Sequence, residues 1–289
     1  MTKKIFCLLL SASILCVLGR SAALAQQVNL QVSPPPIAYP YFEPGRKDFK
    51  FTGTYFSLSA NNFNAKGGGL NGIVRGAFNE TLALDGQMGL MGMSGEMPGF
   101  ALPFWYSNTL WTPIIDGKGD LSGIMFPMSA NLEVQVANSP KGSFLMFGGP
   151  SMSFSKLSLS TPYHARAGAT NASKTRFIMD YTMFLFGVQF GAQGSIPAGD
   201  KVKFAPFLMM TTQGGSSSFT FKHGYSGVRS LITGGVSDIE PFTTSSIGMD
   251  IIIVPWNLSL GTLIQQAAAN KDQEGFKTTL IQLSWHFRS

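Results

Sequence analysis

The residues best suited to acid–base chemistry are two histidines and a group of acids that fall between the predicted strands. They are His164, His223, Asp116, Asp120, Asp180, Asp238 and Glu240. A histidine held by a carboxylate can act as a general base and activate water for hydrolysis. No spacing ties these residues together, and the sequence has no G-x-S-x-G, H-E-x-x-H, C-x-x-C or phosphate-loop motif. We therefore expect solvated loop charges, no enzymatic activity, no metal site and no cofactor.

A second polar set alternates with apolar residues along the predicted strands. In the hairpin on either side of residue 80, Phe78 and Leu82 must share one face, which places Arg75 directly opposite Asp85. Opposite charges at opposed positions stabilise a strand pair by about 0.2–1 kcal/mol. We expect eight such residues to face the interior of a barrel, as a polar filling or as the lining of a solute path: Arg75, Asp85, Gln87, Glu133, Lys203, Asp250, Gln282 and His286.

The elements that position these residues are strands with period-2 alternation, of which the last is the clearest. Ile281, Leu283, Trp285 and Phe287 share one face of it, and Gln282, Ser284 and His286 share the other. A soluble sheet would cover the apolar row with a second layer, whereas a transmembrane barrel turns it to lipid. The predicted strands are 49–60, 69–78, 82–91, 124–136, 143–157, 184–193, 202–212, 247–253, 258–265 and 279–287.

The connections between these strands alternate in length. The segments 79–81, 139–141, 196–201 and 254–257 are short, whereas those near 61–68, 92–122, 158–177, 213–243 and 267–275 are mostly longer. Outer-membrane barrels have short periplasmic turns and longer extracellular loops. The pattern predicts an all-β, antiparallel up-and-down transmembrane barrel of about ten strands. Twelve strands is the alternative, if residues 104–115 and 216–222 also cross the membrane.

The N-terminus reads as an export signal. Lys3 and Lys4 precede an apolar run from Ile5 to Leu18, and residues 23–25 form an A-x-A cleavage site. We expect residues 1–25 to be the signal peptide, 26–47 a Pro-rich periplasmic segment and 48–289 the barrel. Both cysteines, Cys7 and Cys16, fall in the signal, so the mature chain would have no disulfide or thiolate site.

Composition argues against two other classes of protein. The formal net charge of +6 includes Lys3, Lys4 and Arg20 of the signal, and no basic cluster stands out, so we expect no nucleic-acid partner. The uncharged stretches are broken by Gly, Pro, Asn and Gln and alternate with period 2. Helical membrane spans are disfavoured because they would place those polar groups in lipid.

Aromatic residues mark the expected membrane interfaces. Trp105, Tyr106 and Trp111 lie in a long connection, and Trp285 and Phe287 lie in the last strand. Tryptophan and tyrosine are enriched where lipid meets water, so we expect an aromatic girdle, with ligand capture by an exposed loop as the alternative. Five methionines, Met88, Met91, Met93, Met209 and Met210, are interpreted as packing residues rather than copper ligands.

The chain resembles bacterial outer-membrane β-barrel proteins at the level of the class. Phe287, with Trp285, Leu283 and Ile281 before it, is similar to the C-terminal signal that the barrel-assembly machinery reads, although Arg288 and Ser289 extend beyond it. The resemblance implies Gram-negative outer-membrane localisation after export, with membrane lipid and the assembly machinery as partners. Omptin proteases, which place an Asp–His pair at the extracellular rim, resemble the chain in strand count only.

The expected function is a narrow or plugged, porin-like pore or a structural surface protein. An adhesin-like protein that binds through its long extracellular loops is the alternative, and an outer-membrane hydrolase is the third hypothesis. A small solute is expected to be compatible with the pore, but its identity is left open.

Overall fold

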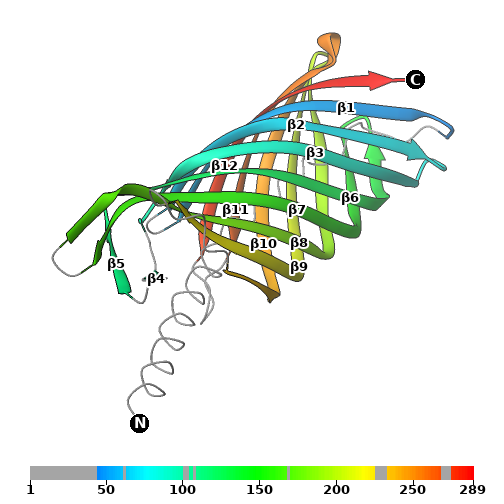
Figure 1. Ribbon diagram of the computed structural model, residues 1–289. Helices are drawn as coiled ribbons and strands as arrows, with labels where there is room; N and C mark the ends of the chain where they lie inside the picture. Colours follow the sequence, from blue (N-terminus) through cyan, green and yellow to red (C-terminus); the bar gives the residue numbers. More distant parts are fainter. Residues whose placement is uncertain are drawn as a thin grey trace.

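Ten long antiparallel strands form a closed ring (Figure 1). The computed structural model describes residues 44–60, 63–99, 104–106, 109–167, 170–224, 233–267 and 275–289. The strands of the ring are β1 (Lys47–Ala60), β2 (Phe63–Ala77), β3 (Leu82–Met97), β6 (Gly119–Ser139), β7 (Gly142–Ala167), β8 (Thr170–Ala198), β9 (Val202–Gly224), β10 (Thr233–Ile253), β11 (Leu258–Ala267) and β12 (Phe276–Arg288). Each pairs with its neighbour in the chain order of this series, and β12 pairs with β1.

The prediction of ten strands is confirmed. Residues 104–115 form β4 (Phe104–Tyr106) and β5 (Thr109–Ile115), which lie outside the ring. β5 pairs with the end of one strand of the ring, β7, from Tyr163 to Arg166, and β4 pairs with the other side of β5. Residues 216–222 belong to β9 and are not an additional span. The predicted signal and most of the Pro-rich segment lie outside the described residues.

The two ends of the barrel differ in their connections. We call the end with the connections 78–81, 140–141, 199–201 and 254–257 the turn end, and the opposite end the loop end. The short 3-10 helix η1 (Val254–Trp256) forms the last of these connections, and Asn257 follows it in the left-handed conformation at φ 51°. Lys47 and Arg288 also lie at the turn end, where β1 begins and β12 ends.

Several strands are longer than the sequence predicted. β7, β8 and β9 continue to residues 167, 170 and 224, so most of the predicted 158–177 and 213–243 loops are strand. The sequence-based boundaries are wrong because the apolar row changes face. On β8 the outward Phe184, Phe186 and Val188 are apolar, but towards the loop end the inward Met183 and Tyr181 are apolar instead. In the sequence, this one-residue shift of the apolar pattern looks like the end of a strand. The backbone pairing of β8 with β9 nevertheless continues through it.

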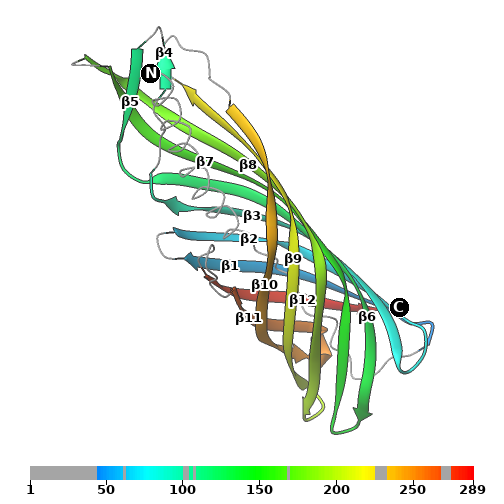
Figure 2. The ribbon, with the colours of Figure 1, turned by 90° about the horizontal axis from the view of Figure 1, so that it is seen from below.

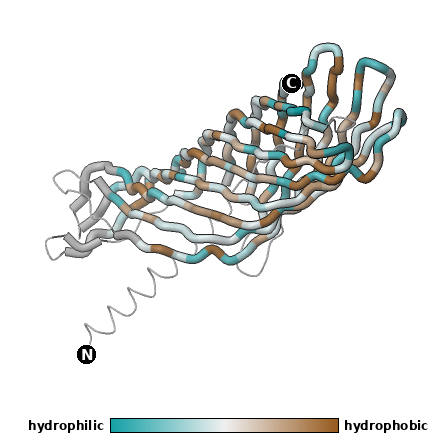
Figure 3. The backbone as a smooth tube through the Cα atoms, turned by 90° about the vertical axis from the view of Figure 1, so that its right-hand side faces the viewer, coloured by the Kyte–Doolittle hydropathy of each residue, from teal (hydrophilic) through white to brown (hydrophobic). Residues whose placement is uncertain are grey.

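The change of face divides the barrel into two zones. Towards the turn end the outer face is a band of exposed apolar residues such as Leu70, Leu132, Phe190 and Leu283, which is the surface that lipid requires. Towards the loop end the strands leave this band, and their apolar residues face the interior instead. Hydrophobic and hydrophilic residues alternate along the strands in both zones, and the extended strands form one tall wall (Figures 2 and 3).

Closure of the ring between β1 and β12 is directly testable. Tyr55 and Ile281 are opposed in this pair, and both side chains face outward. Opposed Cα atoms lie about 4.5–5.5 Å apart, within disulfide range. In a barrel that begins at Gln26 and has no other cysteine, Tyr55→Cys with Ile281→Cys is expected to oxidise almost completely, visible as a reductant-sensitive mobility change on a denaturing gel. Tyr55→Cys with Leu283→Cys, two residues out of register, is the control, and equal cross-linking of both pairs would contradict this register.

Candidate functional site

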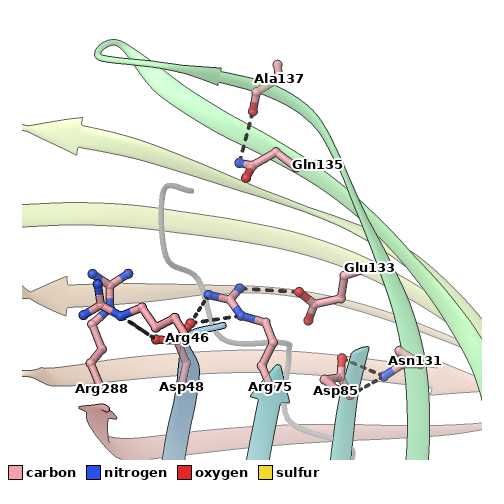
Figure 4. A network of polar contacts seen from close by, with 9 residues as sticks. All are labelled: Arg46, Asp48, Arg75, Asp85, Asn131, Glu133, Gln135, Ala137 and Arg288. Carbon is pink, nitrogen blue, oxygen red and sulfur yellow. Dashed lines mark hydrogen bonds and ion pairs between the residues drawn. The ribbon is translucent and has the colours of Figure 1, made fainter. Parts of the chain in front are cut away.

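The inner face of the turn-end zone carries a buried cluster of charged residues centred on Arg75 of β2 (Figure 4). Its guanidinium donates through Nε to Asp48 Oδ2 at 3.1 Å and also through Nη2 to the same oxygen. Nη1 lies 3.4 Å from Glu133 Oε2 of β6. The side chains of Arg75 and Glu133 are 1% and 0% exposed. A planar guanidinium suits this arrangement because its fork can serve two carboxyl groups at once.

The predicted hairpin register is observed, but the sequence did not identify these ion pairs. Arg75 stands opposite Asp85, and both side chains are 1% exposed on the inner face. Asp85 accepts hydrogen bonds from Asn131 Nδ2 at 2.9 and 3.2 Å, and Asn131 Oδ1 accepts one from Gln189 Nε2 at 2.8 Å. The polar contacts therefore connect β3 to β6 and β6 to β8. The second of these contacts passes across β7, which lies between β6 and β8.

Asp48 connects this cluster to the turn-end rim. Its Oδ1 lies 3.3 Å from Arg288 Nε and 3.8 Å from Arg46 Nε, so three guanidinium groups surround one carboxylate (Figure 4). Sequence reasoning missed Asp48 because the first strand was predicted to begin at residue 49. The alternation of Asp48, Lys50 and Thr52 with outward Phe49 and Phe51 was the available signal.

A second ion pair crosses the interior. Lys50 Nζ of β1 lies 2.6 Å from Asp250 Oδ2 of β10, and the two side chains are 0% and 1% exposed. In the ring, β12 and β11 separate these strands, so the contact spans the barrel as a chord. Gly261 of β11 makes room for it, because a Cβ there would overlap Asp250 Oδ1. Asp250 was predicted to face the lumen, but its partner was not predicted.

The other predicted lumen residues lie on the same inner face. Gln87, Gln282 and His286 are buried, and a ring nitrogen of His286, Nε2, lies 2.9 Å from Ser259 Oγ. Lys203 lies at the turn-end rim and is only partly buried, beside a cavity of about 400 Å³ whose lining includes Asn138.

The predicted aromatic residues separate into two groups. Trp285 and Phe287 face outward near the turn end and are 41% and 57% exposed, as expected for side chains at the lipid boundary. Trp105 and Tyr106 lie on β4 and Trp111 on β5, where the backbone but not the side chains is described. The girdle interpretation of these three residues stays a prediction. Of the five methionines, Met88 faces outward, and Met91, Met93 and Met209 face inward.

The acid and histidine residues placed in loops by the sequence lie mostly on strands. His164, Asp180 and His223 belong to β7, β8 and β9, Asp120 to β6, and Asp238 and Glu240 to β10; only Asp116 lies in a turn. The prediction of loop positions is wrong for these strand residues, for the reason given above: the apolar row changes face. Pairing of β5 with β7 brings Asp116 Oδ1 within 2.7 Å of His164 Nδ1, a contact that the sequence gave no spacing to predict.

The outer face above the apolar band carries further ion pairs. Asp180 accepts from Lys222 Nζ at 2.7 Å and from Ser158 Oγ at 2.9 Å, and Arg176 lies 3.1 Å from Asp120. Burial alone would raise the pKa of Asp180, but these hydrogen bonds and the charges of Lys222 and Lys156 bring that pKa below its ordinary value. Exposed pairs of this kind contribute little stability and mark a surface in contact with water.

The described residues lack two other kinds of feature. They contain no group of three or more His, Cys, Asp or Glu residues placed to hold a metal ion. No helix among them is long and apolar enough to cross a membrane.

Comparisons with known proteins place the chain by fold alone. No family model matches it, and no curated protein matches it. Among solved structures it is similar to the outer membrane protease OmpT from Escherichia coli, with 8% identity, a TM-score of 0.48 and coverage of 87% of this chain and 99% of OmpT. It is also similar to an outer membrane channel from Pseudomonas putida F1, with 14% identity, a TM-score of 0.39 and coverage of 88% and 100%. It is also similar to OprG from Pseudomonas aeruginosa, with 9% identity, a TM-score of 0.38 and coverage of 86% of this chain and 99% of OprG.

Proposed function

We propose that this chain is an integral outer-membrane β-barrel whose lumen is closed to the free passage of ions, the plugged form of a narrow pore. The observation that carries the proposal is the Lys50–Asp250 chord together with the fork of Arg75 onto Asp48 and Glu133. A water-filled channel would hydrate these side chains, whereas here they are nearly inaccessible to solvent.

The proposed orientation follows from the two ends of the barrel. The turn end, with the first and last residues of the ring, faces the periplasm, and the loop end faces outward, as is usual for bacterial barrels. In this orientation Phe287 lies at the periplasmic rim, where the assembly machinery would engage β12. Lipid contacts the apolar outer band, and export by the N-terminal signal precedes insertion.

Planar-bilayer recording tests the closed lumen. The wild-type protein is expected to give no steady openings, because an ion would have to displace paired charges from a dry interior. Removal of both cross-lumen cations, in Lys50→Ser with Arg75→Ser, is expected to raise the frequency of openings severalfold. Lys66→Ser removes an exposed, outward lysine of β2 and is expected to leave the recordings unchanged. Large, steady currents through the wild-type barrel would contradict the proposal.

A hydrolase is a second candidate because of the Asp116–His164 contact at the loop end. We propose that this contact instead ties the turn before β6 to β7, since it lies on the outer face of the wall and the structure offers no nucleophile motif beside it among the described residues. Peptide or ester hydrolysis by the purified barrel that is lost in His164→Ala would favour the enzyme. The adhesin hypothesis concerns loops that lie largely outside the described residues.

A further inference from the structure

A cavity of about 400 Å³ lies on the inner face of the barrel at the turn end. Its lining includes residues of β6 to β9 and of the turn between β6 and β7: Asn138, Pro140, Gly142, Ser195, Pro197 and Lys203. Strand pairing brings them together, because Ser143 stands opposite both Asn138 on β6 and Ser195 on β8. Ser195 is 3% exposed, whereas its neighbour Ile196 is 54% exposed. The cavity is therefore a recess of the lumen and not a groove in the lipid-facing surface.

Lys203 is the charged residue of this lining, and it has no counter-ion among the described residues. Opposite it on the two neighbouring strands stand Pro197 and Ile252, which are both apolar. Asp250, two positions further into the barrel on β10, already accepts from Lys50 Nζ at 2.6 Å. A partly buried ammonium group without a counter-ion is unfavourable, so this position favours an anion that can supply one.

Other charged residues at this rim do not replace the missing counter-ion. Arg288, at the end of β12, is also positive, and its charge acts on Lys203. The carboxylate partner of Arg288 is Asp48, 3.3 Å from its Nε, and Arg75 holds the same carboxylate (Figure 4). Asp200, in the turn before β9, is exposed and forms no ion pair with Lys203. An anion at Lys203 would therefore be attracted by two positive groups, and no carboxylate of the described residues already occupies its place.

Ser195 adds a neutral hydrogen-bond donor beside Lys203. Its Oγ is buried and has no hydrogen-bond partner among the described residues. Several other buried polar atoms of the inner face share that property, but Ser195 also lines the cavity. It stands two positions from Pro197, the residue opposite Lys203, and such diagonal positions are about 7–8 Å apart, within reach of a long side chain. One carboxylate can therefore accept from the hydroxyl and from the ammonium group together.

The rest of the lining indicates the size and character of the bound molecule. Pro140, Pro197 and Gly142 present apolar surface, and the hydroxyl of Ser139 is already used, because it donates to Gly142 O at 3.1 Å. The volume of about 400 Å³ is within the range of about 300–1,000 Å³ of small-molecule sites and exceeds what an inorganic ion fills. One cation beside an apolar wall matches a molecule with one negative charge on an apolar body.

We propose that the turn-end cavity binds small organic monoanions, in which one carboxylate is carried by an apolar body. The carboxylate accepts from Lys203 Nζ and Ser195 Oγ, and the body lies against Pro140 and Pro197. The inference goes beyond the closed lumen and does not depend on it, because the cavity lies at the rim and a ligand need not cross the barrel to reach it. In the orientation proposed above, the site faces the periplasm.

Three probes that share one ring and differ in charge test the inference on the barrel in phosphatidylcholine nanodiscs. They are 4-fluorobenzoate, which is negative, 4-fluorobenzamide, which is neutral, and 4-fluorobenzamidine, which is positive. Fluorine NMR line widths report binding, and empty nanodiscs give the contribution of lipid. We expect saturable binding of 4-fluorobenzoate, weaker binding of the amide and none of the amidine. If 4-fluorobenzoate does not bind saturably, or if the amide binds as tightly, the inference is wrong. Displacement of 4-fluorobenzoate by equimolar inorganic phosphate would indicate a site for inorganic anions and contradict the apolar body.

Variants of the lining locate the site. Lys203→Gln is expected to weaken 4-fluorobenzoate binding by about ten- to a hundredfold, the effect of losing a hydrogen bond to a charged group, and Lys203→Arg is expected to keep most of the binding. Ser195→Ala is expected to weaken binding by about two- to tenfold. Lys201→Gln removes the same charge from the exposed turn and is the matched control, with no expected change. Equal losses in Lys203→Gln and Lys201→Gln would mean that the net charge of the rim attracts the anion, and would overturn the site.

Stability and conductance separate this inference from misfolding and from the proposed function. Lys203→Gln breaks no ion pair, so it is expected to unfold at the same guanidinium concentration as the wild type. A marked loss of stability would reveal a structural partner of Lys203 and overturn the inference. A barrel that is silent in bilayers but does not bind 4-fluorobenzoate keeps the closed lumen and loses the anion site. A barrel that conducts steadily yet binds the probe in a Lys203-dependent way contradicts the closed lumen and keeps the site.

Discussion

Lys50→Met is expected to lower the free energy of unfolding by about 3–5 kcal/mol, because it leaves the Asp250 carboxylate buried without its partner. The pair is 2.6 Å long and both side chains are almost fully buried, so water cannot replace the lost ammonium group. Guanidinium-induced unfolding from phospholipid vesicles measures the change. Lys66→Met, on the exposed outer face of β2, is the control and is expected to change stability by less than about 0.5 kcal/mol.

The double variant distinguishes the cost of an unpaired charge from the value of the pair. Leucine has the branched shape of aspartate, so Lys50→Met with Asp250→Leu replaces the ion pair by apolar groups of similar volume. Such replacements are often neutral or stabilising, and we expect the double variant to recover most of the loss. If the double variant were as unstable as Lys50→Met alone, the Lys50–Asp250 ion pair would stabilise the barrel by more than the neutralisation of one buried charge by the other.

The parts of the fold that the sequence predicted depend on neighbours along the chain. The last strand is readable because outward Ile281, Leu283 and Trp285 alternate with inward polar residues, and β12 has that pattern. The register of Arg75 against Asp85 follows from a short turn that must keep Phe78 and Leu82 on one face. In both cases one local constraint, the two-residue period of the strand, decides the structure.

The strand ends were lost where that period changes phase. Between Phe184 and Met183 the apolar row moves from the outer to the inner face, because the strand passes from lipid into water while its interior stays dry. An unbroken alternation of outward apolar and inward polar residues ends where the faces exchange. The strands β7, β8 and β9 were therefore predicted too short. The same shift also hid part of the buried apolar cluster near the loop end, since members such as Leu159, Tyr163 and Phe177 were assigned to a loop.

The contacts within the site depend on ring closure and could not be read from spacing. Lys50 and Asp250 are 200 positions apart, and only the order β1, β12, β11 and β10 brings them to opposite ends of a chord. Asp116 meets His164 because β5 extends the sheet edge beside β7. The inward orientation of Asp250 was therefore predictable from alternation, whereas its partner required the closed barrel.

Arg75→Met is expected to be the most damaging single substitution in the interior, with a loss of at least about 3–5 kcal/mol in the same unfolding measurement. It leaves Asp48 and Glu133 without the guanidinium that lies between them, and Glu133 is fully buried. Arg75→Lys is expected to recover only part of the loss, because one ammonium group cannot reproduce a fork that reaches β1 and β6 together.

Two further variants separate the carboxyl partners of Arg75. Arg75→Met with Glu133→Gln removes the buried carboxylate and is expected to recover more stability than Arg75→Met with Asp48→Asn, because Asp48 keeps Arg46 and Arg288 as partners at 3.8 and 3.3 Å. Equal recovery in the two variants would mean that the rim arginines do not compensate Asp48. A larger recovery on changing Glu133 would show that the barrel needs Arg75 mainly to pair the carboxylate in the dry interior. The Lys50–Asp250 ion pair lies in the same interior. We propose that these paired charges keep ions out of the lumen.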